Sequence, residues 1–212
     1  AFWRTYFDID RPYEHYRAQI AGDPFLEAAA EFGDGIRILR QEPFEALCTF
    51  ILSQCNNIPR ITALVERLAR HFGRPTPSGY AFPEPETLAL LSPEDLAPVR
   101  AGYRAPYLLA AARAVAEGRL DLSALSDPSL PLNEARARLT ALPGVGRKVA
   151  DCVLLFGMGR WDAFPVDVWM RRALAQYYPA GFQPEKYPFA AGLFQQYMFF
   201  YIRHLSNTRP AT

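Results

Sequence analysis

The chain has 212 residues, of which 50% are hydrophobic and 21% are charged, and its formal net charge is +1. This composition is typical of a globular protein, and the small net charge excludes nucleic-acid binding through bulk charge alone. No apolar run approaches the roughly 18 residues of a membrane span, so we expect a soluble protein without membrane contact.

The N-terminal residues and the cysteines indicate the cellular environment of the protein. The first ten residues lack the layout of a secretory signal and the chain does not begin with Met, so we expect a fragment or a processed product. Cys48, Cys55 and Cys152 are odd in number and lack metal-ligand spacing. They argue against a disulfide framework and a zinc or iron–sulfur site, and they favour a reducing, intracellular compartment.

Apolar residues recur with helical spacing along most of the chain. Positions 44, 47, 48 and 51 are apolar, which is the pattern of one buried helix face. A second helix is expected from near Pro59 to Phe72, with Gly73 as its stop and the polar segment SQCNNI before it. Further helices are expected over 106–117, from Asn133 through Leu139, directly after residue 146, from Asp167 to about Tyr177, and over 187–205.

Signals for other structure are few. Residues 35–39, GIRIL, alternate briefly and are expected to be extended, and the proline-rich segment 73–87 predicts an ordered surface loop. We therefore predict an all-α fold in a single domain with two helical lobes. The lobes are expected at about 40–130 and about 131–212, with the N-terminal segment 1–39 packed on the second.

The segment LPGVG, residues 142–146, predicts a tight turn between two helices. Its glycines permit unusual backbone conformations and a close approach of another molecule. The second helix starts there, so its free N–H groups and the positive end of its dipole suit a phosphate. This helix-hairpin-helix pattern predicts DNA binding, although many helix pairs without that function use such a turn.

Lys148 directly follows this turn and is one of two lysines in a chain with 21 arginines. In a purely structural role it would pair with Asp151 three residues later, a contact worth about 0.2–0.5 kcal/mol. Arginine would serve that pair equally well. Lysine differs because it can lose its proton near neutral pH and act as a nucleophile. The sequence around Lys148 is compatible with both roles.

Asp167, in FPVDVW, is expected to cap the helix that follows it. A carboxylate held at a helix start is rigid, and it could at the same time face a lysine. A lysine nucleophile beside a fixed anion suits attack on a carbon that develops positive charge, such as the anomeric carbon of a nucleoside.

Four segments carry a resemblance to a known family: FEALCTFILSQCNNIPRI (44–61), GYRAPYL (102–108), LPGVGRKVADC (142–152) and PVDVW (165–169). In this order they resemble the helix-hairpin-helix DNA glycosylase superfamily, and within it the 8-oxoguanine DNA glycosylases of the Ogg type. The resemblance implies a bifunctional glycosylase and AP lyase acting on double-stranded DNA that contains an oxidised purine. We expect a monomer located in the cytoplasm, at the bacterial nucleoid, or otherwise inside the cell.

The resemblance also implies roles for individual residues. Lys148 matches the lysine that displaces the damaged base and forms a Schiff base with the sugar, and Asp167 matches the aspartate that stabilises the cationic sugar. The base must first leave the stack. Residues that fill the vacated space, hold the partner cytosine or contact the DNA are expected at Asn56, Asn57, Arg60, Tyr103, Arg104, Gly144, Val145, Gly146 and Trp169.

A base pocket and a cation site complete this assignment. Cys152, Phe156, Gln195 and Phe199 fall where the family builds its base pocket, although without the resemblance Cys152 and Phe199 are simply core residues. The carbonyls of Thr140, Leu142 and Val145 match those that hold a structural K⁺ or Na⁺. No cofactor, catalytic metal or iron–sulfur cluster is expected.

Three departures from the family pattern stand out. Cys55 replaces an asparagine that hydrogen-bonds the orphaned cytosine, and because a thiol is a weak donor and acceptor, selectivity for cytosine is expected to be relaxed. Trp169 replaces a histidine that contacts a phosphate in the eukaryotic members. The resemblance also implies that the chain begins after the N-terminal β-domain of Ogg proteins, which would leave the contact that separates 8-oxoguanine from guanine unassigned.

Two other functions remain open. One is a glycosylase for oxidised pyrimidines that resembles endonuclease III, although no cysteine follows Cys152 to build the iron–sulfur cluster common in that group. The other is a helix-hairpin-helix module that binds DNA without chemistry, which would not need both Lys148 and Asp167. An alkylated-base glycosylase is disfavoured because those enzymes usually lack the lysine.

Overall fold

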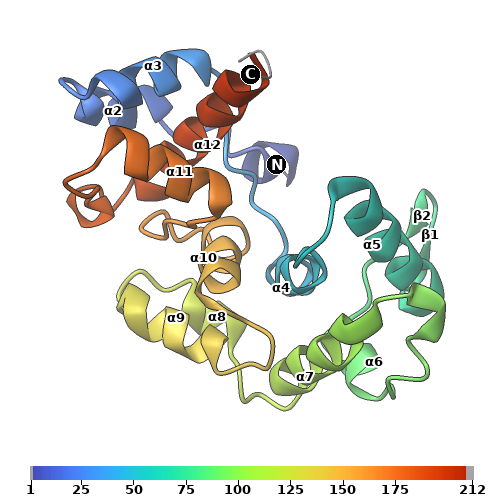
Figure 1. Cartoon of the computed structure of the whole chain (residues 1–212). Helices are drawn as coiled ribbons and strands as arrows, with labels where there is room; N and C mark the ends of the chain where they lie inside the picture. The colour runs from blue at the N-terminus through green and yellow to red at the C-terminus, as the bar shows by residue number, and fades with distance from the viewer. Residues whose placement is uncertain (1, 209–212) are drawn as a thin grey trace. The chain divides into compact units, whose positions relative to one another are not determined.

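The computed structural model describes residues 2–208, which divide into two compact units. Residues 2–40 and 159–208 form one, here called the terminal unit, and residues 41–158 form the other, the middle unit (Figure 1). Helices build both units, so the all-α prediction is confirmed. Across residues 2–208, no helix combines the length and the apolar character needed to cross a membrane.

The terminal unit is built around its last helix, which packs on α3 and α11. Leu26, Phe194, Tyr197 and Met198 are fully buried in this core. The elements are α1 (Phe2–Tyr6), α2 (Tyr13–Arg17), α3 (Pro24–Phe32), α11 (Val168–Tyr177) and α12 (Ala191–Thr208), with 3-10 turns at Ala18–Ile20 and Pro184–Lys186.

A buried carboxylate ties the N-terminal segment together. Asp8 accepts hydrogen bonds from Arg11 Nε at 2.8 Å, from the Tyr13 hydroxyl at 3.1 Å and from Arg40 Nε at 3.0 Å. A buried charge is stable only when it is paired and hydrogen-bonded. These contacts therefore fix the path of residues 8–40 within the terminal unit.

The middle unit surrounds α4, which contacts α5, α7 and α10 (Figure 1). The face predicted to be buried, at positions 44, 47, 48 and 51, is buried. The elements are α4 (Pro43–Leu52), α5 (Ile58–Phe72), β1 (Pro75–Thr76), β2 (Gly79–Tyr80), α6 (Pro85–Ala89), α7 (Ala105–Ala116), α8 (Leu122–Leu125), α9 (Leu132–Thr140) and α10 (Arg147–Phe156), with 3-10 turns at Ala97–Val99 and Gly102–Arg104.

Some predicted boundaries are wrong. Residues 35–39, expected to be extended, belong to neither of the two strands of the described chain, and the Ile38 N–H bonds instead to the Tyr13 hydroxyl. The segment 73–87 contains the antiparallel pair β1–β2 and the start of α6 at Pro85, a residue suited to a first helical turn. The last helix begins at Ala191 rather than 187, because Pro188 disfavours a helical conformation at Tyr187.

The division into units also differs from the predicted lobes. The expected boundary lies near residue 130, whereas residues 131–158 belong to the middle unit. The physical reason is packing, since α10 contacts both α9 and α4. The hairpin that carries Lys148 therefore shares a core with α4, which comes much earlier in the chain.

Candidate active site

The turn between α9 and α10 has the geometry that LPGVG predicts. The Val145 N–H donates to the Leu142 carbonyl at 3.1 Å, and Gly144 takes a positive φ of 78°. Gly146 precedes α10 without a capping side chain, and residues 146–148 are exposed. The first N–H groups of α10 thus face solvent at the positive end of the helix dipole, where a phosphate can bind.

Gly144 also packs closely on α7, which leads to a testable result. A Cβ at this position would lie 2.4 Å from Tyr107 Cδ2. Because of this overlap and the positive φ, Gly144→Ala should lower the free energy of unfolding in urea by about 1–3 kcal/mol. Gly146→Ala is the matched control, since φ there is −87° and no atom lies within 4 Å of the added carbon. Equal losses in both variants would rule out the Tyr107 contact as the cause.

Lys148 is exposed on the first turn of α10. Its Nζ lies 5.7 Å from the centroid of the Phe50 ring, and no salt bridge within residues 41–158 includes it. The buried carboxylate of Asp151 is instead held by Arg136 Nε at 2.7 Å and lies 3.8 Å from Arg147 Nε. The pairing of Lys148 with Asp151 is therefore wrong as an explanation of this lysine.

Phe50 is a site residue that the sequence analysis missed. It lies on α4, and its ring stacks on Phe156 with centroids 5.6 Å apart. Phe50 thereby joins the lysine to a residue expected in the base pocket. The sequence did contain a clue to this residue. Phe50 falls outside the buried face of α4 at positions 44, 47, 48 and 51, and a large aromatic side chain there is not explained by packing within that face.

Asp167 caps α11 as predicted. Its Oδ1 accepts the Met170 N–H at 2.8 Å, and the side chain is half-buried. A carboxylate held by its own helix start has little freedom to move. Within the terminal unit, Asp167 is thus a fixed negative charge at the beginning of a helix.

The loop between α4 and α5 is shaped by its asparagines. Asn56 donates to the Leu52 carbonyl at 3.0 Å and accepts the Asn57 N–H at 3.0 Å. Asn57 caps α5 by accepting the Arg60 N–H at 3.0 Å. Both side chains therefore hold the loop, and their proposed DNA contacts stay a prediction. Between α4 and Asn56, Cys55 is exposed with a positive φ of 47°.

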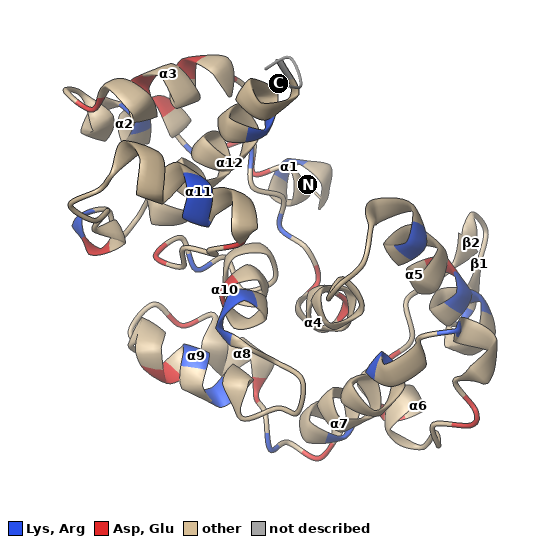
Figure 2. Cartoon of the chain, in the orientation of Figure 1, with Lys and Arg blue, Asp and Glu red and all other residues tan. Residues whose placement is uncertain are grey.

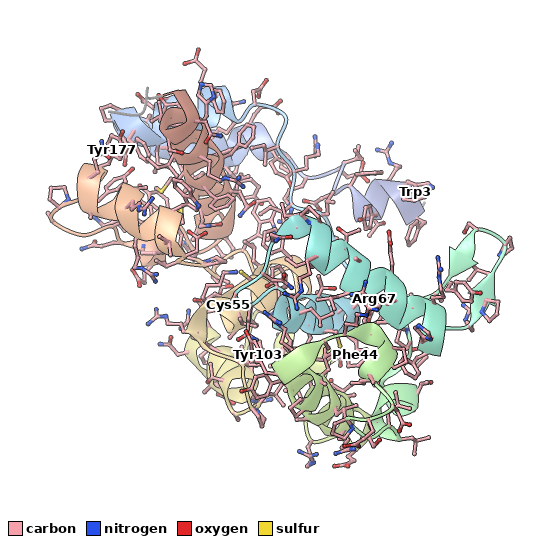
Figure 3. All side chains as sticks on the ribbon, turned by 45° about the vertical axis from the view of Figure 1, so that its right-hand side comes forward. Trp3, Phe44, Cys55, Arg67, Tyr103 and Tyr177 are labelled. Atoms are coloured by element: carbon pink, nitrogen blue, oxygen red, sulfur yellow. The ribbon has the colours of Figure 1, made fainter. Side chains whose placement is uncertain are left out.

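Tyr103 lies beside Cys55 of this loop although the two are far apart in the chain (Figure 3), and Arg104 contacts the same loop. The Arg104 guanidinium is buried and donates to the carbonyls of Gln54 (Nε, 3.0 Å) and Cys55 (Nη2, 3.2 Å). The Tyr103 hydroxyl also donates to the Gln54 carbonyl, at 3.3 Å. The pKa of the Tyr103 hydroxyl is raised, mainly because the group is desolvated and to a smaller extent because it hydrogen-bonds with the Cys55 side chain. The structure thus brings together Cys55, Tyr103 and Arg104, with Arg104 serving as a brace for the loop.

The residues expected in the base pocket form two pairs. Cys152 and Phe156 lie one turn apart on α10 in the middle unit, and Gln195 and Phe199 lie one turn apart on α12 in the terminal unit. Cys152 and Gln195 are buried, whereas the two phenylalanines are half-buried. Each pair therefore places an aromatic ring near the surface of its unit.

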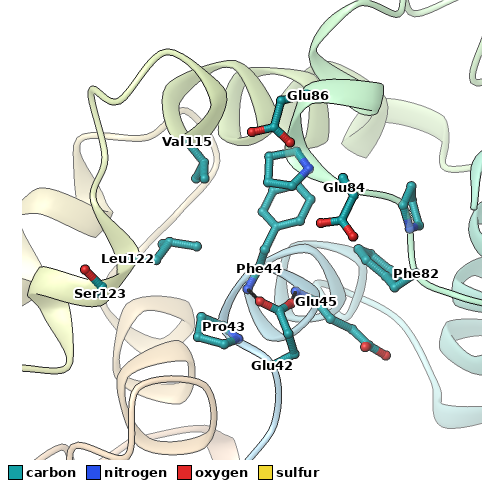
Figure 4. Close-up of a pocket in the computed structure, with 12 residues that line it drawn as sticks. Glu42, Pro43, Phe44, Glu45, Phe82, Glu84, Glu86, Val115, Leu122 and Ser123 are labelled. Carbon is teal, nitrogen blue, oxygen red and sulfur yellow. Dashed lines mark hydrogen bonds between the residues drawn. The ribbon is translucent and has the colours of Figure 1, made fainter.

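One pocket of the middle unit is too acidic to bind the DNA backbone. A cavity of about 570 Å³ in the middle unit is lined by Glu42, Glu45, Glu84 and Glu86 (Figure 4). These residues stand at the starts of α4 and α6, where Glu42 accepts the N–H groups of Phe44 and Glu45. Burial and the Glu42 charge raise the pKa of Glu45. Helix starts favour carboxylates, and their charge would repel a phosphate backbone.

The predicted structural cation would bind backbone carbonyls at the turn between α9 and α10. Thr140 ends α9, and Leu142 and Val145 lie in the LPGVG segment, so the three carbonyls are close in the chain. In residues 2–208, no group of three or more His, Cys, Asp or Glu side chains is arranged to hold a metal ion.

The fold and these sites define a class of protein, and comparison with known proteins identifies it. The family described as HhH-GPD superfamily base excision DNA repair protein matches residues 48–191, and the 8-oxoguanine DNA glycosylase N-terminal domain matches residues 1–47. The chain belongs to the HhH-GPD superfamily.

Relatives within this family share much of the sequence. The chain is 38% identical over 157 residues to the N-glycosylase/DNA lyase OGG1 of Arabidopsis thaliana, a match to 69% of this chain and 42% of that protein. It spans about half the length of the curated relatives it matches.

Two solved structures are similar over almost the whole chain. MBOgg1 in complex with a low-affinity DNA ligand is 40% identical, with a TM-score of 0.87. The Clostridium acetobutylicum 8-oxoguanine glycosylase/lyase, in complex with double-stranded DNA containing cytosine opposite 8-oxoG, is 36% identical, with a TM-score of 0.86. Each match covers 96% of this chain and 74% of the other.

Proposed function

We propose that this chain excises 8-oxoguanine from duplex DNA and then cleaves the strand at the abasic site. The observation that carries the proposal is the exposed Lys148 on the first turn of α10, outside any salt bridge of the middle unit. The fixed carboxylate of Asp167 supports it. So do the names of the relatives, which include glycosylase/lyase enzymes.

The proposed reaction begins with Lys148 Nζ as a neutral amine. Nζ bonds to C1′ of the sugar while the bond from C1′ to the base breaks, and the base leaves with that electron pair and takes up a proton. Asp167 would stabilise the positive charge that develops on the sugar. The exposed Tyr103 and the loop around Asn56, which Arg104 holds in place, would occupy the gap left by the extruded base.

Strand cleavage would follow from the covalent intermediate. Nζ loses a proton, the bond from C1′ to O4′ opens, and O4′ takes a proton, which leaves a Schiff base between Nζ and C1′. Removal of a proton from C2′ then expels the 3′ phosphate by β-elimination. The exposed N–H groups at the start of α10 would hold a backbone phosphate during these steps.

A panel of duplexes tests the substrate and the reaction together. Each duplex carries one lesion, and excision is compared with that from undamaged guanine. We expect cutting at 8-oxoguanine opposite cytosine. Preferential cutting at oxidised pyrimidines would support the endonuclease III-like alternative, and binding without any cutting would support a non-catalytic DNA-binding module.

Cys55 leads to a prediction about the opposite base. Asparagine tolerates a positive φ better than cysteine, so Cys55→Asn should raise the free energy of unfolding by up to about 1 kcal/mol. Its amide can also hydrogen-bond a cytosine, so the variant should prefer cytosine opposite 8-oxoguanine more strongly than the parent does. Excision rates with each opposite base measure this, with Cys55→Ser as control. Equal preference in the parent and the asparagine variant would rule out a role of Cys55 in selectivity.

We extend the proposal to the partner, the location of the protein and a structural cation. The partner is duplex DNA containing an oxidised purine, bound by a monomer inside the cell, in the cytoplasm. The carbonyls of Thr140, Leu142 and Val145 would hold a structural K⁺ or Na⁺, because the Leu142 oxygen accepts one N–H and has a second lone pair available. Stabilisation of the fold by K⁺ relative to a bulky organic cation would support this site.

A further inference from the structure

A small cavity opens between α11 and α12 of the terminal unit. It has a volume of about 210 Å³, and its wall includes Trp169, Arg172, Gln176, Tyr177, Ile202 and Ser206. This volume is many times the roughly 10–15 Å³ that a cavity needs to hold one water molecule, so a phosphate group fits. The wall combines a cation, an amide, a hydroxyl and aromatic rings, which are groups that bind phosphate and pack against sugar.

Arg172 gives the cavity a positive charge. It is exposed, and no salt bridge within residues 2–40 and 159–208 includes it. In the same unit, Arg11 and Arg40 pair with Asp8. Figure 2 shows the basic residues on α11. The charge of Arg172 is therefore available for a ligand rather than used within its own unit.

Trp169 supports the Arg172 side chain. The guanidinium carbon lies 5.1 Å from the centroid of the indole ring, within the range of a cation–π contact. A guanidinium placed over a ring keeps its N–H groups in its own plane, where they can form two parallel bonds to a phosphate. The contact thus orders a long side chain in advance of binding.

The position of the cavity relates it to the proposed reaction. Arg172 follows Asp167, the N-cap of α11, by five residues, which is a rise of about 7.5 Å and a turn of about 140° around the helix. One strand of duplex DNA carries a phosphate about every 3.4 Å along its axis. If the damaged sugar faces Asp167, a neighbouring phosphate of the same strand would lie against the flank of α11 that carries Arg172.

We propose that Arg172, supported by Trp169, binds a backbone phosphate one or two nucleotides from the damaged nucleotide. This inference rests on the proposed function and makes Arg172 a positioning residue. It would fix the register of the damaged strand along α11 without touching the reacting atoms.

The test uses neutral linkages in a duplex that cannot be cleaved. The duplex carries a tetrahydrofuran abasic analogue opposite cytosine, and each of its phosphates near the analogue is replaced in turn by a methylphosphonate. Arg172→Gln should bind the unmodified duplex about tenfold more weakly than the parent does. The slope of log affinity against log salt concentration should become shallower by the contribution of about one phosphate contact. A neutral linkage at one of the first two positions beside the analogue should weaken the parent by the same factor and leave Arg172→Gln unchanged.

Arg171→Gln is the matched control, because Arg171 is exposed on the same helix but does not line the cavity. This variant should stay sensitive to the neutral linkage. Equal sensitivity of the parent and Arg172→Gln at every position would overturn the inference. The failure of this inference can be distinguished from the failure of the proposed function. If Arg172→Gln loses sensitivity to the neutral linkage but the protein excises no base, only the proposed activity is wrong. If the protein excises the base but Arg172→Gln keeps that sensitivity, only the Arg172 contact is wrong.

Discussion

Replacing Lys148 by glutamine should abolish the covalent adduct that borohydride traps and lower base excision by on the order of a thousandfold or more. The expected loss is large because the amine forms the new bond to C1′, and no other lysine lies in the middle unit. DNA binding should persist, since the N–H groups of α10 and the loop around Cys55 are unchanged. The measurement is single-turnover excision together with gel analysis of the trapped adduct.

Two variants separate the nucleophile from its charge. Lys148→Arg keeps a cation at the start of α10 but cannot act as an amine nucleophile, so it should be as inactive as Lys148→Gln. Lys186→Gln removes the other lysine of the chain, which lies in an exposed 3-10 turn, and should leave excision and the adduct unchanged. An adduct of undiminished strength from Lys148→Gln would remove this residue from the mechanism.

Local features of this fold follow from local chemistry, which is why the sequence predicts them. Asn57 and Asp167 cap α5 and α11 with hydrogen bonds that span only three residues. The turn at 142–146 depends on Gly144, whose positive φ is a property of one residue type. Helical spacing likewise predicts the buried face of α4, because one helix defines it.

Features that depend on contacts between distant segments are not predictable in this way. Residues 131–158 join the middle unit because α10 packs on α4, which no periodicity reveals. Arg104 is 50 residues from Gln54, and its burial against that carbonyl depends on how α7 approaches the loop. Lys148 and Phe50 meet for the same reason, although a phenylalanine off the buried face was a usable signal.

The two roles of Asp167, as a helix cap and as a catalytic carboxylate, can be tested separately. Asparagine accepts the Met170 N–H as well as aspartate does, but it carries no charge. Asp167→Asn should therefore keep the free energy of unfolding within about 0.5 kcal/mol, whereas Asp167→Ala should lose about 1 kcal/mol with the cap. Excision should fall by roughly a hundredfold or more in both variants, because the charge that stabilises the cationic sugar is lost from each.

The contrast between the two variants is informative because stability and rate should change independently. If Asp167→Asn excises 8-oxoguanine as fast as the parent, the carboxylate serves α11 only as a cap, and the sugar cation is stabilised by another group. If both variants lose stability equally, the cap itself is misassigned. Thermal unfolding and single-turnover excision on the same protein samples distinguish these outcomes, since the rate at saturating enzyme does not depend on a small change in folding.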